Sequence, residues 1–209
     1  MAKRKDGKET RRKLLDTACE VFAEKGFQAA KVTEICRRAG VNVAAVSYYF
    51  GDKESLYTSA WRQTVEDFLS SDIPPPEDLP PEERLFITVR SIIRKILSID
   101  KNKGYFRRLE LMEMANPTGL VDNAWKELIG PRQQKLLKII RDIMGPAASE
   151  NAVRLCGMSI INQCRGYILM QKNRLAFLES EELTPEKADQ ITEHISRFSI
   201  AGIRGVCNS

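Results

Sequence analysis

The sequence contains one histidine and five cysteines among 209 residues, and this scarcity excludes several kinds of site. His194 has no suitably spaced ligand partner, and no two cysteines have the C-x-x-C spacing of a zinc or redox site. No catalytic triad or phosphate-binding loop can be assembled from the remaining residues. We therefore expect no catalytic residue, no metal site and no cofactor, and an enzyme is the function that the sequence favours least.

Long apolar runs are missing as well. No stretch approaches the roughly 18 residues that a membrane-spanning helix needs. The segment after the basic N-terminus is interrupted by Asp16, Glu20 and Glu24, so it does not have the pattern of a signal peptide. We expect a cytoplasmic protein with no membrane partner, in which cysteines at apolar positions are small buried thiols rather than disulfides.

Positive charge is concentrated at the N-terminus. Residues 1–13 carry seven basic and two acidic side chains, which accounts for the whole net charge of +5. Such an arm can be a solvated, disordered tail, and it can equally follow the phosphates of DNA. Charge alone does not separate these two hypotheses.

Alternating β-branched residues are also missing, and apolar residues recur instead with the period of a helix. The sequence therefore predicts an all-α protein. Five prolines between positions 74 and 81 predict a stiff connector at residues 72–82. Thr184 and Pro185 mark the start of the last helix as its N-cap and first residue. The predicted helices cover residues 9–25, 31–38, 42–49, 52–69, 82–99, 103–115, 119–129, 131–144, 149–174 and 185–204.

The second and third predicted helices form a helix-turn-helix pattern. Gly40 supplies the turn between them, and Asn42 can cap the third helix. An ordinary three-helix core would have the same order of helices. The adjacent Tyr48 and Tyr49 argue for an exposed function, because neighbouring helical residues point about 100° apart and cannot both face one core.

Residues 26–56, with the sequence GFQAAKVTEICRRAGVNVAAVSYYFGDKESL, resemble the DNA-binding domain of TetR-family transcriptional regulators. The resemblance rests on the spacing of Gly26-Phe27, the AGV and YYF triplets, Lys53 and Leu56. Members often have threonine or serine where Ala30 and Lys31 stand, so the usual N-cap of the second helix is missing here. The resemblance implies that the residues contacting DNA are Val32, Thr33, Asn42, Val43, Ala44, Ser47, Tyr48, Tyr49 and Lys53.

Residues 109–145, and above all the EMANPT segment at 113–118, resemble the C-terminal domain of the CecR-like branch of this family. The resemblance implies a ligand-controlled repressor, and large flexible apolar side chains suit a small apolar or aromatic effector. For each single residue, plain core packing is the alternative. The candidate effector-pocket residues are Phe106, Arg108, Leu109, Met112, Glu113, Asn116, Trp125, Asn162, Gln163 and Tyr167.

The last two helices are expected to pair with those of a second copy in a four-helix dimer interface, as the resemblance implies. The domains would then be a flexible basic arm (1–8), a three-helix helix-turn-helix DNA-binding domain (9–53) and a helical effector-binding and dimerisation domain (54–209). The candidate interface residues are Met158, Ile161, Ile168, Ile191, Ile195 and Phe198.

Two functions therefore remain from the sequence. The first is a homodimeric repressor that a small-molecule effector releases from a palindromic double-stranded DNA operator. The second is an architectural DNA-binding protein without an effector, which a fully packed C-terminal core would favour.

Overall fold

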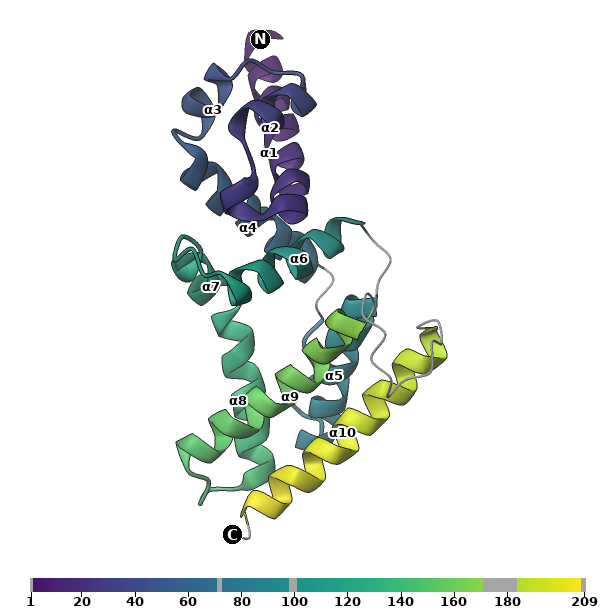
Figure 1. Ribbon diagram of the computed structural model, residues 1–209. Helices are drawn as coiled ribbons and strands as arrows, with labels where there is room; N and C mark the ends of the chain where they lie inside the picture. The colour runs from purple at the N-terminus through teal and green to yellow at the C-terminus, as the bar shows by residue number, and fades with distance from the viewer. Residues whose placement is uncertain (1, 71–72, 98–100, 171–183, 208–209) are drawn as a thin grey trace. The chain divides into compact units, whose positions relative to one another are not determined.

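The computed structural model describes residues 2–70, 73–97, 101–170 and 184–207. Helices and connecting turns make up these ranges (Figure 1), which confirms the predicted all-α architecture for the described residues. None of the described helices is long and apolar enough to cross a membrane. The helices are α1 (Ala2–Ala29), α2 (Val32–Ala39), α3 (Ala44–Tyr49), α4 (Lys53–Leu69), α5 (Pro81–Leu97), α6 (Lys101–Ala115), α7 (Asp122–Leu128), α8 (Gly130–Met144), α9 (Glu150–Met170) and α10 (Pro185–Cys207).

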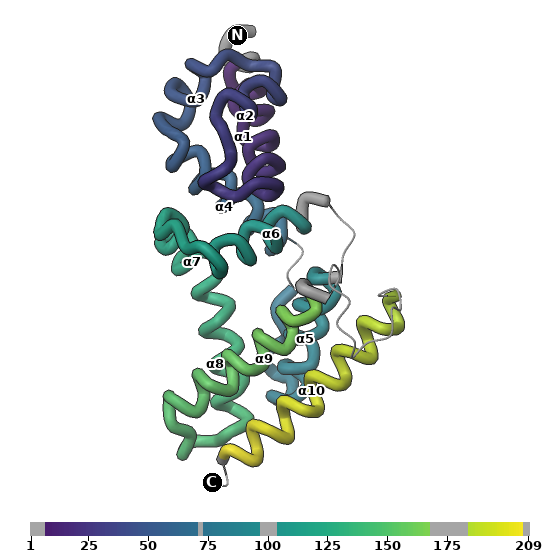
Figure 2. Tube along the Cα trace, in the orientation of Figure 1, coloured from purple at the N-terminus to yellow at the C-terminus, as the bar shows by residue number. Residues whose placement is uncertain are grey.

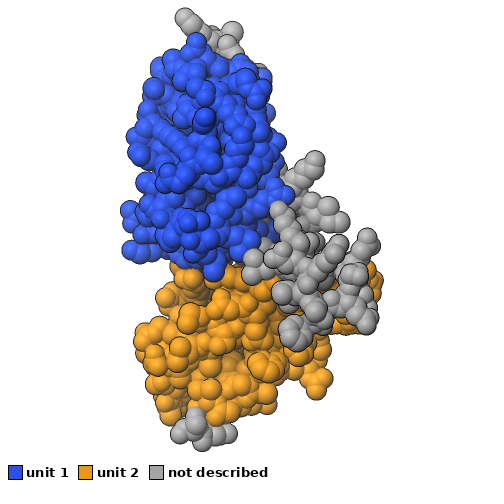
Figure 3. Space-filling view, viewed as in Figure 1, with its two compact units in different colours: residues 1–71, 100–129 blue, residues 72–99, 130–209 orange. Residues whose placement is uncertain are grey.

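The chain forms two compact units (Figure 3). Unit 1 contains residues 1–71 and 100–129, and unit 2 contains residues 72–99 and 130–209. This division differs from the predicted domains, which placed a boundary after residue 53 and assigned all later residues to the C-terminal domain. The reason is long-range packing, because α4, α6 and α7 bury their apolar faces together with α1.

The core of unit 1 is aromatic. Tyr57 and Trp61 of α4 are 1% and 0% exposed, and Phe106 and Leu109 of α6 are 3% and 0% exposed. The Trp61 ring lies 5.9 Å from that of Phe106 and 5.8 Å from that of Trp125, measured between centroids. Rings of this size bury large apolar areas, so they hold α4 and α6 in one core.

Helix α1 starts earlier than expected. Residues 2–8 belong to this helix, where the sequence predicted a separate arm at 1–8. Lysine and arginine are good helix formers, and Glu9 pairs with Lys13 one turn later at 2.9 Å. Near the other end, Gly26 has φ 72° and ψ 175°, a conformation that only glycine adopts readily. The helix direction therefore breaks at Gly26, just before Phe27.

Unit 2 contains α5, α8, α9 and α10 (Figure 2). Their buried side chains form an aliphatic core. Ion pairs join Arg204 to Glu82 and Arg94 to Asp189, so the start of α10 lies near the end of α5 and the two helices are antiparallel. Helices α8 and α9 approach closely at Gly157, where an added Cβ would lie 2.8 Å from Leu137 Cδ2.

The start of α10 is as predicted. The Thr184 hydroxyl accepts a hydrogen bond from the backbone N–H of Lys187 at 3.3 Å, and Pro185 is the first helical residue. In α9, the predicted residues beyond Met170 lie outside the described part of the chain.

Candidate nucleic-acid interface

Helices α2 and α3 are joined by a tight turn at Gly40. This residue has φ 68° and ψ 33°, in the left-handed region that favours glycine, and the Val41 N–H that follows it donates to the Cys36 carbonyl at 3.0 Å. Ile35 on α2 and Val46 on α3 are both buried in the core of unit 1. The turn and these buried residues fix α3 relative to α2, which is the geometry of a helix-turn-helix.

Asn42 caps α3 with its side chain. Its Oδ1 accepts a hydrogen bond from the Ala44 N–H at 2.9 Å, and its backbone carbonyl accepts one from Ala45 at 2.9 Å. The side-chain oxygen is therefore occupied, and the amide NH₂ is the group that remains to donate outward. The side-chain hydrogen bond predicted for Asn42 is therefore present, although Val43 lies between Asn42 and the first residue of α3.

Most of the predicted base-reading residues are exposed together. They lie at the starts of α2 and α3 and along the outer side of α3. Val32 differs, because it is half-buried against the core of unit 1 and belongs to the support of α2 rather than to its surface. We call the exposed set the recognition surface: Thr33, Asn42, Val43, Ala44, Ser47 and Tyr48.

The two tyrosines have different surroundings. Tyr48 is 81% exposed, whereas Tyr49 is half-buried, and their rings meet edge to face with centroids 4.7 Å apart. A Cβ added at Gly7 would lie 3.3 Å from the Tyr49 hydroxyl oxygen, so Tyr49 packs beside the first turns of α1. Tyr48 is therefore the tyrosine that faces outward, and Tyr49 supports it.

Lys53 begins α4 and is held in place on two sides. Its ammonium lies 4.5 Å from the centroid of the Phe27 ring and donates to the Gln28 carbonyl at 3.5 Å. Burial lowers the pKa of Lys53. Asp52 caps the same helix by accepting from the Ser55 N–H at 2.7 Å, which lowers the pKa of Asp52. Lys53 is thus a positioned cation at a helix start.

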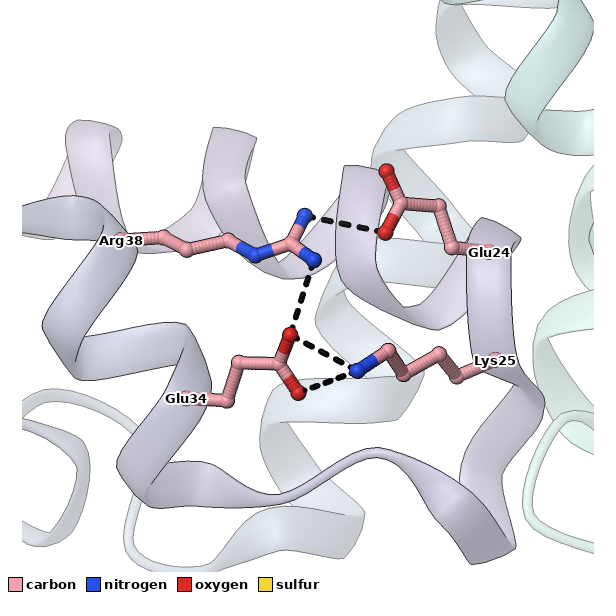
Figure 4. A network of polar contacts seen from close by, with 4 residues as sticks. All are labelled: Glu24, Lys25, Glu34 and Arg38. Atoms are coloured by element: carbon pink, nitrogen blue, oxygen red, sulfur yellow. Dashed lines mark hydrogen bonds and ion pairs between the residues drawn. The ribbon is translucent and has the colours of Figure 1, made fainter.

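An ion-pair network that the sequence analysis did not identify joins α1 to α2 (Figure 4). Glu34 accepts from Lys25 at 2.6 and 2.8 Å and from Arg38 at 2.8 Å, and Arg38 also pairs with Glu24 at 2.9 Å. Glu34 and Arg38 are four residues apart on α2, which was the one signal for this contact in the sequence. The network fastens α2, which carries Thr33 of the recognition surface, to α1.

Basic residues of α1 lie beside this surface. Arg11 and Arg12 are exposed, and the Arg11 guanidinium lies 4.8 Å from the centroid of the Phe50 ring just after α3. The positive charge predicted to follow phosphates is therefore carried by a helix that contacts the end of α3. An exposed helix surface bordered by fixed cations defines a DNA-binding protein of the helix-turn-helix class.

The predicted effector-pocket residues are not brought together in one unit. Phe106 and Leu109 are buried in the unit 1 core, Trp125 packs against Trp61, and Glu113 bonds to Tyr57 of α4. These residues attach α6 and α7 to α4, and their assignment to an effector pocket stays a prediction. Unit 1 holds Phe106, Arg108, Leu109, Met112, Glu113, Asn116 and Trp125, and unit 2 holds Asn162, Gln163 and Tyr167.

The predicted interface residues divide into surface and core. Met158 is 60% and Phe198 62% exposed, and Ile161 is half-buried. Ile191 and Ile195 are only 5% and 1% exposed, so they belong to the core of unit 2 and offer little surface to a second copy. The side chain of Ile168 lies outside the described residues. The sequence analysis did not select Leu155 and Val206, which are also exposed.

Comparisons with known proteins agree with this class. The family model for the C-terminal domain of the HTH-type transcriptional dual regulator CecR matches residues 81–203, and that for bacterial regulatory proteins of the tetR family matches residues 14–60. The first match covers more than half of the chain. The chain belongs to the TetR family of transcriptional regulators, with a C-terminal domain of the CecR type.

Individual relatives are also regulators rather than enzymes. The chain is 26% identical to the dual regulator CecR of Shigella flexneri over 91% of this chain and 89% of that protein. It is 30% identical to the regulator RutR of Escherichia coli (strain K12) over 48% of this chain and 46% of that protein. The crystal structure of FadR from Bacillus subtilis in complex with stearoyl-CoA has a TM-score of 0.66 at 18% identity, covering 91% of this chain and 98% of that one, which shows the shared fold.

The ion-pair network makes the stability of unit 1 depend on pH. The hydrogen bond from Lys25 lowers the pKa of Glu34 below its ordinary value of 4.5. A lowered carboxyl pKa contributes stability above the unfolded-state pKa and loses it as the pH falls through the folded-state pKa. We expect Glu34→Gln to unfold at a lower denaturant concentration than the unchanged protein at pH 7. That difference should shrink steadily below about pH 4.5.

Urea unfolding at a series of pH values measures this effect. Glu66→Gln, at an exposed position on α4, is the control and should follow the unchanged protein at each pH. A deficit for Glu34→Gln that stayed constant down to pH 3 would show that the carboxylate charge does not contribute.

Proposed function

We propose that the chain is a homodimeric repressor that binds a near-palindromic DNA operator through two copies of α3 and leaves it when a small apolar or aromatic effector binds the C-terminal domain. The observation that carries this proposal is the recognition surface, which is exposed, rigidly supported and bordered by Lys53 and the basic turns of α1. The site of action would be the cytoplasm.

The chemistry of the recognition surface suggests how it would read DNA. Val43 and Ala44 have only methyl groups to offer, which suit thymine methyls in the major groove. Ser47, Thr33 and the Asn42 amide are the groups able to hydrogen-bond a base edge or phosphate. With so few polar side chains, affinity would come mainly from phosphate contacts and DNA shape.

A second copy would cover the exposed apolar side chains of α9 and α10. Leu155 and Met158 on α9 are 52% and 60% exposed, and Phe198 and Val206 on α10 are 62% and 46% exposed. Large apolar side chains gathered on two neighbouring helices are typical of an interface. A two-fold interface would place two recognition surfaces on one duplex, as a palindrome requires.

The proposed effector would enter unit 2. Its core is aliphatic, with Leu85, Ile93, Ile140 and Ile160 among the fully buried side chains. Tyr167 packs beside this core, and burial raises the pKa of its hydroxyl, so the group would meet a ligand as a neutral donor. The FadR structure of similar fold contains stearoyl-CoA. That observation supports an apolar chain as the first effector to test.

Phosphate and base contacts can be separated by their response to salt. The probe is a duplex of roughly 40 base pairs, long enough for two half-sites, selected from a random library by binding to the protein. We expect Lys53→Ala to weaken binding to every sequence and to make the dependence of log affinity on log salt shallower by about 1.8 in a dimer, because each neutralised phosphate contributes roughly 0.9. Ser47→Ala should instead reduce discrimination between sequences, by about 1 kcal/mol, with an unchanged slope.

Lys126→Ala, at an exposed lysine on α7 of the same unit, is the matched control and should leave both quantities unchanged. A slope of about −2 or shallower for the unchanged dimer would contradict an affinity dominated by phosphates. Failure of the selection to enrich any sequence would favour an architectural protein.

Two exposed methionines provide a matched pair of positions for testing self-association. Met158 on α9 is 60% exposed and Met114 on α6 is 56% exposed, so both substitutions start from similar surface positions. We expect Met158→Glu to convert the dimer to a monomer in sedimentation experiments, because it would place two carboxylates in an apolar interface. Met114→Glu should leave the dimer intact. Equal behaviour of the two variants would place the interface elsewhere.

Effector coupling requires that a ligand change operator affinity. We expect a bound long-chain acyl-CoA, with stearoyl-CoA as the probe, to weaken binding to the selected duplex by roughly 5- to 150-fold, the usual range for coupled sites. Binding of the probe itself is measured by calorimetry, and Tyr167→Ala should weaken it. If the probe binds while affinity for the duplex stays constant, release by this effector is excluded.

A further inference from the structure

A half-buried carboxylate connects three segments of unit 1. Glu113 of α6 accepts a hydrogen bond from the Tyr57 hydroxyl of α4 at 2.5 Å. It also accepts from the backbone N–H of Thr118 at 3.0 Å and from the Thr118 hydroxyl at 3.0 and 3.1 Å. We call Tyr57, Glu113 and Thr118 the Glu113 cluster. The cluster uses both carboxylate oxygens, so it holds α4, α6 and the segment after α6 in one arrangement.

The Tyr57 hydroxyl cannot exchange its hydrogen bond to Glu113 for one to solvent. The side chain is 1% exposed, and burial followed by the hydrogen bond to Glu113 raises the pKa of the hydroxyl. The group therefore remains a protonated donor throughout the usual working range of pH. Glu113 in turn fixes where the far end of the Tyr57 ring can lie.

The Tyr57 ring is also connected to Lys53, through Phe27. Its centroid lies 5.1 Å from that of Phe27, with the planes tilted by 53°, and 4.9 Å from that of Phe22. The Lys53 ammonium lies 4.5 Å from the centroid of the same Phe27 ring. Lys53 and Tyr57 are one turn apart on α4, so Phe27 contacts two successive positions of that helix.

We propose that Glu113 is a positioning residue for Lys53, acting through Tyr57 and Phe27. Each partner is a rigid group, either a ring or a carboxylate held by several donors, so a displacement of one is passed to the next. The ammonium is confined in the free protein, and less side-chain freedom is lost when it meets a phosphate. This inference rests on the proposed function, in which Lys53 contacts DNA.

The inference gives a function to the polar contacts of the segment after α6. Thr118 also accepts from the Leu120 N–H at 3.2 Å, which fixes the segment between α6 and α7. A rearrangement of this segment would remove donors from Glu113 and loosen Tyr57. The position of a phosphate-binding cation would then depend on residues that do not touch DNA.

The test measures salt dependence in four variants with the selected duplex. Tyr57→Phe keeps the ring and removes the donor, Glu113→Ala removes the acceptor, and Glu113→Gln keeps an acceptor of similar size. The fourth is Tyr57→Phe combined with Lys53→Ala. We expect the first two to weaken binding on the order of fivefold, the effect of about one hydrogen bond, and to shift the salt slope toward that of Lys53→Ala. Glu113→Gln should retain most of the affinity that Glu113→Ala loses.

A purely structural role would give a different result. Partial unfolding lowers the concentration of active protein, and titration at saturating duplex corrects for this loss. It leaves the dependence of log affinity on log salt unchanged. In the Lys53→Ala background, Tyr57→Phe should not weaken DNA binding any further, because the effects of residues that act through one group are non-additive. Thermal unfolding followed by circular dichroism checks that each variant is folded.

Two outcomes would overturn the inference, and they can be told apart. If Lys53→Ala changes affinity and slope but Tyr57→Phe adds its full cost in that background, the positioning role alone is wrong. If Lys53→Ala leaves the slope unchanged, the phosphate contact of the proposed function is wrong, and the positioning role is lost with it.

Discussion

The arrangement of unit 1 depends on the burial of Tyr57 and Trp61 between α1 and α6. These two side chains of α4 are almost completely shielded from water. Removing a buried ring of this size costs about 3–5 kcal/mol, which is a large share of the stability of a small domain. Because α4 is a continuous helix, its buried middle also determines where its first residue, Lys53, lies. The packing of the core therefore also determines the position of this cation beside the recognition surface.

Positive charge by itself does not identify the DNA-contacting residues of this protein. Lys25 and Arg38 are engaged with Glu34 and Glu24, so they fasten α1 to α2. Arg11 and Lys53 instead lie over aromatic rings, where the cation is held without being neutralised. The aromatic residues beside α3 and α4 thus keep two positive charges available while restricting their positions.

The sequence was sufficient for features that depend on local contacts. Helix periodicity, the turn at Gly40 and the caps at Asn42 and Thr184 each involve residues a few positions apart, and the structure confirms them. Contacts between distant segments could not be predicted in this way. The apolar pattern of Phe106 and Leu109 is the same whether they line a ligand cavity or pack on α4. Which of the adjacent Tyr48 and Tyr49 faces outward was decided by α1, whose helical start was itself not expected.

The distribution of ring side chains between the two cores has a consequence for optical spectroscopy. Both tryptophans of the chain, Trp61 and Trp125, lie in unit 1, whereas the buried core of unit 2 contains aliphatic side chains and a cysteine in the described residues. Intrinsic fluorescence excited at the tryptophan band therefore reports on the surroundings of α4 and α7 alone. Trp61 and Trp125 therefore give unit 1 an optical signal of its own, which the unfolding of unit 2 alone would leave unchanged.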